Sequence, residues 1–334
     1  MNKFYKYLFS ITLIMGTMVS ISSLSWLTAW MGLEMNLLSM MPLMKSFKNK
    51  YSSEATIKYF ITQASASLVL LLSILIITNS WQSSMTQNHS IYLTEMALLL
   101  KMGAAPLHFW LPEVVSGLTW PMTMVTLTWQ KIAPMILFSY LEPNINLLAS
   151  VIITSSLVGG ILGMNQLCLR KLLAFSSINH IAWMLSTIMF SKSIWLIYFL
   201  TYSFINYSLI LTLNKNKILF MNQMTKLSPS NKTSKLIFIL NFLSLGGLPP
   251  FIGFLPKWLT IHVMTQMNMF FTSTILIVST LIALFMYLRT MFSSMTLSSE
   301  ESTKLYASKF NNMMIFTSCS TILGLALLMS MPMM

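Results

Sequence analysis

Four ionisable side chains interrupt long apolar runs of this sequence, at Glu34, Lys101, Lys131 and Lys257. A charge at the centre of a membrane helix costs at least roughly 2.5–3.5 kcal/mol, so such residues usually serve a function. Burial disfavours the charged form of a lysine, and a nearby carboxylate restores it. Moving the partner charge can therefore load or unload a proton, and this set of residues predicts proton-transfer chemistry.

The depth of these residues follows from the apolar runs that contain them. Glu34, Lys101 and Lys131 each lie ten residues into a run, which is about 15 Å deep and near the bilayer midplane. Snorkelling to the membrane surface is a poor explanation for these three, but it stays open for Lys257, which is nearer the end of its run. A purely structural Glu–Lys pair would explain one lysine and leave the other two unexplained.

The elements that must position these residues are membrane-spanning helices. The chain is 55% hydrophobic and only 8% charged, whereas soluble proteins carry roughly 25% charged residues. About eleven apolar runs reach the roughly 20 residues that cross a bilayer. We predict spans near 4–22, 24–44, 57–79, 91–110, 121–140, 146–164, 172–190, 194–213, 236–260, 270–291 and 313–331. The chain is thus predicted to be an all-α, polytopic membrane protein with a single membrane domain over residues 1–334.

Glycine and proline interrupt the fourth and ninth predicted spans. The fourth continues from Lys101 as KMGAAPLHFWLPEV, and the ninth contains SLGGLPPFIGFLPKW at 244–258. With five spans in each half, the break falls in the fourth member of both halves, and the halves have opposite orientations. Discontinuous helices at matching positions are typical of inverted-repeat transporters. We therefore predict antiporter-like five-helix repeats at about 4–140 and 146–291, two discontinuous helices, and a C-terminal helix at about 313–331.

The net charge of +13 is distributed according to membrane side. Nearly all lysines and arginines outside the spans lie at the N-terminus or in loops after even-numbered spans, whereas the opposite side holds only Lys192. This bias predicts that the N-terminus lies inside and the C-terminus outside. A nucleic-acid surface does not fit, because the charges follow the topology. The longest inner connection is predicted at 214–234, with either a short helix at 218–224 or a plain coil.

Metal and nucleotide chemistry find no support in the sequence. Cys168 and Cys319 are far apart, and neither belongs to a paired metal-ligand motif. No glycine-rich nucleotide fingerprint follows a strand-like segment. We predict no metal-binding and no cofactor-binding residues in this chain.

Five ordered motifs carry a resemblance to the NADH dehydrogenase subunit 2 family of mitochondrial complex I (NADH:ubiquinone oxidoreductase chain 2). They are WMGLEMNLLS (30–39), KMGAAPLHFWLPEV (101–114), TWQKIAP (128–134), RKLLAFSSINHIAWM (170–184) and GGLPPFIGFLPKW (246–258). The resemblance covers essentially the whole chain. The length and the Met-rich composition resemble the animal version, and in particular arthropod members.

The resemblance implies a proton-translocating core subunit in the membrane arm of the respiratory-chain enzyme, a translocase that couples electron transfer from NADH to ubiquinone with proton transport. Glu34 matches the family's membrane glutamate, and Lys101 matches its partner lysine on the first broken helix. Lys131 matches the central lysine, and Lys257 matches the lysine beside the second broken helix. We expect Glu34 and Lys101 to approach directly or through one water molecule.

Histidines provide further candidates, since a neutral imidazole can both donate and accept a hydrogen bond. His180 and His108 fall at matching motif positions and are possible relay residues. An interfacial structural role is an equally good interpretation of His108, which lies beside two prolines. His89 and His262 are predicted to lie in loops.

The resemblance also implies partners and a location. NADH, FMN, iron–sulfur clusters and ubiquinone would be bound by other subunits, and none by this chain. The expected partners are other membrane-arm subunits, including neighbouring antiporter-like ones, and inner-membrane lipids, with no nucleic acid. The expected location is the mitochondrial inner membrane, with the N-terminus in the matrix and the C-terminus in the intermembrane space. A stand-alone cation/proton antiporter is the main alternative, and a structural spacer is the third interpretation.

Overall fold

The computed structural model describes residues 4–46, 49–79, 84–141, 143–223 and 232–296. The regular structure in these ranges is helical, apart from one isolated bridge between Cys168 and Phe220. This confirms the predicted all-α class. The predicted C-terminal helix at 313–331 lies outside the described residues.

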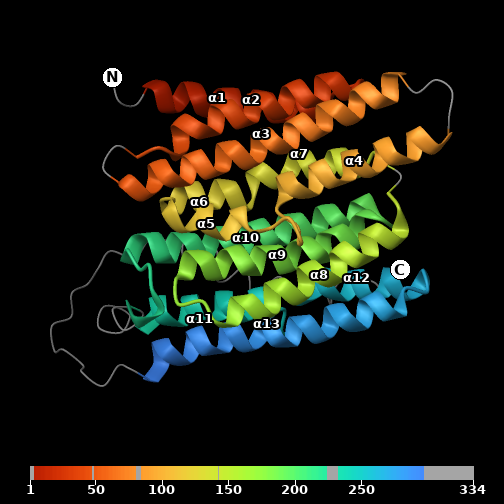
Figure 1. Ribbon diagram of the computed structural model, residues 1–334. Helices are drawn as coiled ribbons and strands as arrows, with labels where there is room; N and C mark the ends of the chain where they lie inside the picture. Colours follow the sequence, from red (N-terminus) through yellow and green to blue (C-terminus); the bar gives the residue numbers. More distant parts are fainter. Residues whose placement is uncertain (1–3, 47–48, 80–83, 142, 224–231, 297–334) are drawn as a thin grey trace. The chain divides into compact units, whose positions relative to one another are not determined.

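The chain divides into two compact units, Met1–Val151 and Ile152–Met334, and the division falls inside α8 (Ile145–Met164). The first unit contains α1 (Phe4–Ile21), α2 (Trp26–Met44), α3 (Lys50–Asn79), α4 (Ser84–Met102), α5 (Trp110–Gly117), α6 (Trp120–Leu127) and α7 (Trp129–Phe138) (Figure 1). The second contains α9 (Leu169–Ile188), α10 (Lys192–Asn216), α11 (Lys232–Gly246), α12 (Phe254–Gln266) and α13 (Phe270–Thr296). An inverted relation between the two repeats stays a prediction.

Each of the first ten predicted spans coincides with one helix or with two consecutive helices. Among the described residues, five helices are long and apolar enough to cross a membrane by length and composition alone. These are Phe4–Ile21, Lys50–Thr78, Ile145–Met164, Lys192–Asn216 and Phe270–Phe292. The total of about eleven spans stays a prediction.

In the first unit, α1 to α4 lie side by side along the chain order. The backbones of α1 and α2 approach closely because glycine lines their contact. A Cβ atom on Gly32 would lie 2.6 Å from the Ser20 nitrogen, and one on Gly16 would lie 2.8 Å from the Asn36 side chain. Small residues at such contacts are how membrane helices pack tightly without a hydrophobic driving force.

The first predicted break lies between α4 and α5. Gly103 has φ +77°, a conformation that favours glycine. Its N–H donates to the Leu99 carbonyl at 3.0 Å, and the next N–H, of Ala104, donates to the same carbonyl at 3.1 Å. This left-handed glycine turn ends α4 directly after Lys101 and Met102, so the sequence placed the break correctly.

A third interruption, which the sequence analysis did not predict, separates α6 from α7. The predicted fifth span is two short helices that meet at Thr128, where φ is −118° and ψ is −70°. The Thr128 hydroxyl donates to the Met124 carbonyl at 2.7 Å, a back-bond that bends helices. The prediction of two discontinuous helices is therefore incomplete, because a third span is also irregular.

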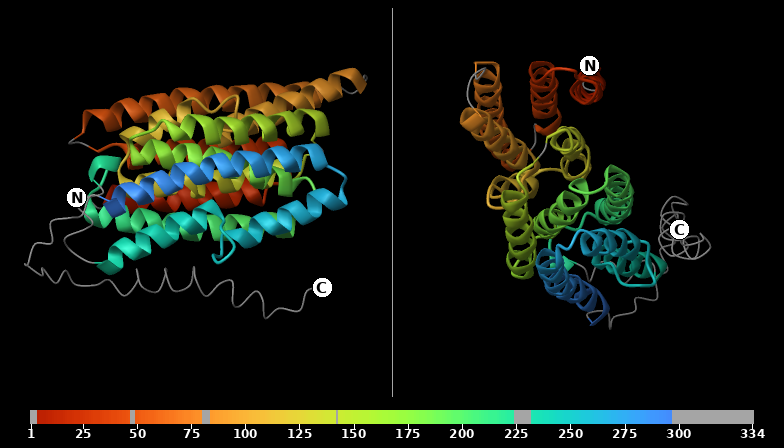
Figure 2. Two further views of the ribbon diagram at one scale, coloured as in Figure 1. Left: turned by 90° about the horizontal axis from the view of Figure 1, so that it is seen from below. Right: turned by 90° about the vertical axis from the view of Figure 1, so that its right-hand side faces the viewer.

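The second unit is built around α9, whose residues from Leu172 to Ile188 are all buried. Helices α10, α12 and α13 all pack against it. In the end-on view, α13 also runs alongside α11, in agreement with the contacts between them (Figure 2). A helix covered on every side can hold polar residues at depth, provided that neighbouring helices supply their hydrogen-bond partners.

The second predicted break lies between α11 and α12 and repeats the turn of the first. Gly247 has φ +76°, and its N–H donates to the Leu243 carbonyl at 3.1 Å. The N–H of Leu248 reaches the same carbonyl at 3.4 Å. The chain then passes through two prolines before α12 begins at Phe254. At both breaks, the first half-helix thus ends in the same left-handed glycine turn.

The predicted inner loop at 214–234 is described only in part. Helix α10 continues to Asn216, where the left-handed residue Lys217 (φ 51°) ends it. Residues 221–223 form one 3₁₀ turn. Of the predicted segment at 218–224, residues 218–223 thus form neither a continuous short helix nor a plain coil, but a bridge residue at Phe220 followed by a single 3₁₀ turn. Residues 224–231 lie outside the described part.

Candidate functional site

In the first unit, Lys101 and Glu34 come from α4 and α2. The Lys101 side chain is buried with 6% of its surface exposed, whereas Glu34 is partly exposed. Among the described residues these two do not form a direct ion pair. The Glu34 carboxylate is nevertheless close enough to act on Lys101 through a Coulomb interaction. A link through one water molecule stays a prediction.

The end of α4 that carries Lys101 is held by two side chains from neighbouring segments. The Gln63 amide of α3 donates to the Lys101 carbonyl at 3.4 Å. The Trp110 indole of α5 donates to the Leu100 carbonyl at 3.0 Å. Carbonyls at a helix C-terminus lack partners inside the helix, so these donors fix the end of α4 and with it the position of Lys101.

Lys131 is the most deeply buried of the predicted relay residues, with 1% of its surface exposed. It lies in the first turn of α7, and its N–H donates to the Thr128 carbonyl at 3.1 Å. Pro134 lies inside the same helix and removes the backbone donor that would otherwise reach Gln130. The Gln130 side chain accepts a bond from the Tyr59 hydroxyl at 3.3 Å. Its Nε2 atom is buried with no partner in the part of the chain that the structure describes.

In the second unit, the Lys257 side chain contacts the break between α11 and α12. Its ammonium group donates to the Gly246 carbonyl, the last residue of α11, at 2.8 Å. Only 8% of Lys257 is exposed. A Cβ atom on Gly247 would lie 2.8 Å from Lys257 Cδ and 2.9 Å from its Nζ. The glycine therefore supplies both the turn and the space in which the lysine side chain lies.

The two candidate histidines have different surroundings. His180 lies on α9 with 6% of its surface exposed, and its Nδ1 lies 2.8 Å from the hydroxyl of Tyr198 on α10. The Tyr202 ring packs against the same imidazole, with ring centres 4.9 Å apart. His108 lies in the first break, where its Nδ1 is 3.2 Å from the Pro106 carbonyl. His180 thus contacts side chains of α10, and His108 lies beside both the Pro106 carbonyl and the Phe109 ring, with ring centres 4.4 Å apart.

Two other histidine predictions are wrong. His89 and His262 were expected in loops, but they lie on α4 and α12. Both are exposed. The Gln266 amide Nε2 donates a hydrogen bond to His262 Nε2 at 3.2 Å, one helical turn away. The helices extend beyond the apolar runs at these positions, so spans predicted from the runs alone were too short.

Sequence reasoning did not identify several polar residues that complete these sites. Gln63 and Tyr198 contact the predicted residues Lys101 and His180, whereas Gln130 precedes Lys131 in the chain and accepts a bond from Tyr59. Polar residues inside apolar runs were a usable signal for the two glutamines. The partnership of Tyr198 with His180 depends on how two helices pack, and a single sequence carries no signal for it.

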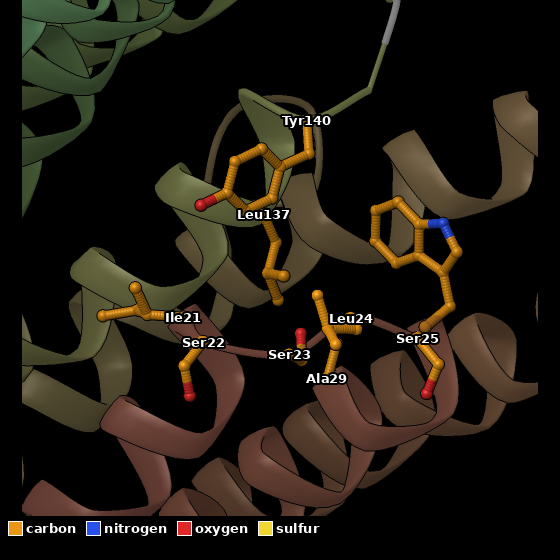
Figure 3. A pocket seen from close by; sticks show the side chains of 9 residues that line it. Ile21, Ser22, Ser23, Leu24, Ser25, Ala29, Leu137 and Tyr140 are labelled. Atoms are coloured by element: carbon orange, nitrogen blue, oxygen red, sulfur yellow. The ribbon is translucent and has the colours of Figure 1, made fainter.

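A pocket of about 440 Å³ lies where the α1–α2 turn meets the end of α7 (Figure 3). Serines 22, 23 and 25 line one side, and Leu137 and Tyr140 line the other. None of its lining residues is a predicted relay residue. Within the described residues, no group of three His, Cys, Asp or Glu side chains could hold a metal ion.

The chain is similar to known proteins in sequence and in fold. Residues 23–283 match the family model described as NADH:quinone oxidoreductase/Mrp antiporter, TM. The chain is similar to NADH-ubiquinone oxidoreductase chain 2 of Anopheles gambiae, with 47% identity over 94% of this chain and 93% of that one. The same protein of Aedes aegypti is 45% identical over 93% and 92% of the two chains. A chain of respiratory complex I from Thermus thermophilus with bound aureothin shares the fold, with TM-score 0.85, 22% identity, and coverage of 96% and 78%.

Proposed function

Because the chain belongs to the NADH-ubiquinone oxidoreductase chain 2 family, we propose that it is a proton-translocating membrane-arm subunit of respiratory complex I. The enzyme activity of that complex is electron transfer from NADH to ubiquinone. The observation that carries this proposal is the similarity over more than nine-tenths of the chain. The three buried lysines in otherwise apolar helices supply groups that can bind and release protons.

The proposed relay uses Glu34, Lys101, Lys131 and Lys257. Burial of the lysines supports it, since a buried ammonium is poised to lose its proton when its electrostatic surroundings change. The Coulomb interaction of Lys101 with Glu34 supports a pair whose charge state can be switched. His180 is proposed as an additional relay residue, because its imidazole is hydrogen-bonded to a hydroxyl group.

His108 is the second histidine of the proposed relay, in the first unit. Its Nδ1 lies 3.2 Å from the Pro106 carbonyl, and this contact fits positioning of the broken segment as well as proton transfer.

Redox cofactors belong to other subunits in this proposal. NADH, FMN, the iron–sulfur clusters and ubiquinone would be bound elsewhere in the complex. The partners of this chain are the other membrane-arm subunits, including neighbouring antiporter-like ones, and inner-membrane lipids. The redox reaction therefore reaches this chain only through its contacts with those subunits.

The stand-alone antiporter remains the competing function, since the matched family model includes Mrp antiporters. We expect the isolated chain, reconstituted in liposomes, to show no exchange of sodium for protons. We also expect the chain to co-migrate with NADH:ubiquinone reductase activity on a native gel. Sodium/proton exchange by the isolated chain, without co-migration, would favour the antiporter instead.

As a member of this family, the chain is a multi-pass protein of the mitochondrial inner membrane. We propose that its N-terminus faces the matrix and its C-terminus the intermembrane space, because lysine-rich loops stay inside. In mitoplasts, whose outer membrane is removed, a protease should leave the connection at 214–234 intact. Inverted inner-membrane vesicles should expose it to the same protease. Cleavage in mitoplasts alone would reverse the orientation.

A further inference from the structure

One buried acidic residue has no place in the relay described so far. Glu95 lies on α4, six residues before Lys101, and none of its surface is exposed. The described ion pairs, which join Lys58 to Glu54 and Glu113, do not include it. Those two acids are half-exposed, so Glu95 differs from them in being fully buried.

The two carboxyl oxygens of Glu95 have different surroundings. Oε1 accepts the backbone N–H of Asn144 at 3.0 Å. Oε2 is buried and has no hydrogen-bond partner within the described residues. One backbone donor replaces little of the hydration that an ionised carboxylate loses on burial. Uptake of a proton on Oε2 removes the charge, so burial favours the neutral carboxyl group over the carboxylate.

A polar connection leads from Glu95 to the surface. Asn144, whose backbone binds Oε1, is itself exposed. Its side-chain amide donates to the hydroxyl of Tyr92 at 2.6 Å, and Tyr92 is partly exposed. Tyr92 lies three residues before Glu95, and residues three apart share a helix face. Asn144 and Tyr92 therefore connect the buried carboxyl group of Glu95 to the protein surface.

The position of Glu95 along α4 places it on one side of Lys101. Six residues of α4 separate it from Lys101, a rise of about 9 Å toward the start of that helix. Helix α4 packs against α7, which carries Lys131 near its beginning. After the end of α7 at Phe138, Asn144 contacts Glu95. Glu95 thus lies at the level of Asn144, about 9 Å along α4 from Lys101.

We propose that Glu95 is a proton-carrying carboxyl group through which the first unit exchanges protons with the membrane face at Asn144 and Tyr92. In each passage Oε2 binds one proton from the lysine side and releases it to water beside Asn144 and Tyr92. The O–H bond at Oε2 is the only covalent bond that forms and breaks, while Oε1 keeps its hydrogen bond from the Asn144 N–H. This inference rests on the proposed proton translocation, and in the proposed orientation that face is the intermembrane space.

A purely structural role makes a different prediction. The Oε1 bond alone could anchor the start of α8, which begins at Ile145. Glu95→Gln separates the two roles, because the amide oxygen still accepts the Asn144 N–H but the side chain cannot carry a proton. Glu54→Gln makes the same change at an exposed acid, and Lys58 retains Glu113 as its partner there.

The test uses assembled complex I in sealed vesicles and measures the proton-to-electron ratio and the turnover. We expect Glu95→Gln to lower the ratio to that of a Lys131→Met complex, with no further loss when both changes are combined. Glu54→Gln should leave it unchanged. Infrared difference spectra during turnover should lose one carboxyl band in the Glu95→Gln complex.

Two results would contradict this scheme at different levels. The first result is an assembled Glu95→Gln complex whose proton-to-electron ratio and carboxyl bands are unchanged, while Lys131→Met lowers the ratio. Glu95 would then have a structural role only. Unchanged ratios in both variants would instead overturn the proposed relay itself.

Discussion

Complex I that carries Lys131→Met is expected to assemble normally but to transfer no protons through this subunit. Methionine keeps much of the volume of the lysine stem, and at 1% exposure the site is closely packed, so removal of the ammonium group should leave the fold intact. The titrating group itself is lost. Because electron transfer is coupled to pumping, NADH oxidation with ubiquinone should also slow several-fold. Proton-to-electron ratio and turnover in reconstituted vesicles measure both effects.

The matched control is Lys192→Met, the same chemical change at an exposed lysine at the start of α10. It should leave ratio and turnover at wild-type values. An assembled Lys131→Met complex that pumps and turns over normally would remove Lys131 from the relay.

Gly253→Ala is expected to have the largest effect on stability. A Cβ atom at Gly253 would overlap the Ser244 carbonyl oxygen, and the other atom of that carbonyl would be 2.8 Å away. These are backbone atoms of α11 and cannot move aside as a flexible side chain could. Overpacking typically costs about 1–3 kcal/mol and more in rigid places. Against a total stability of about 5–15 kcal/mol, we expect a strong loss of assembled complex on native gels.

Gly246→Ala is the control for this change, since it lies on the other side of the same break. The atoms nearest to a Cβ atom there would be Tyr287 Cδ2 at 3.5 Å and two Leu284 atoms at 3.8 Å, which is ordinary contact. The carbonyl that binds Lys257 is unchanged. Assembly should therefore stay near normal. Equal assembly of the two variants would show that the close approach at Gly253 does not stabilise the break.

The sequence predicted the helices and two of the breaks for simple physical reasons. The thickness of the bilayer sets the length of each apolar run, and glycine in a left-handed conformation marks the end of α4 and of α11. The interruption at Thr128 was missed because the residues around it, TLTWQK, contain neither glycine nor proline. A threonine back-bond depends on a side-chain rotamer, for which the sequence gives no direct sign.

The sequence could predict which residues of the candidate site are buried, but not their partners. Lys101, Lys131 and Lys257 stand out in the sequence because charges in apolar runs are rare, and all three are buried. Their partners could not be predicted, since the Gly246 carbonyl reaches Lys257 across eleven residues through a turn of specific shape. The importance of Glu95 was likewise hidden, because it depends on the return of the chain at Asn144.

The hydrogen bond from Lys257 to Gly246 gives the second unit a counter-charge that cannot be titrated. The carbonyl end of a helix such as α11 carries about half a negative charge, which comes from aligned peptide dipoles and is present at every pH. The counter-charge near Lys101, by contrast, is a side-chain carboxylate, that of Glu34. A neutral amine still donates a hydrogen bond, so Lys257 can remain bound to Gly246 in either state. The charge of Lys257 is therefore expected to respond to water access or to movement of the half-helices, whereas that of Lys101 also depends on where the Glu34 side chain lies.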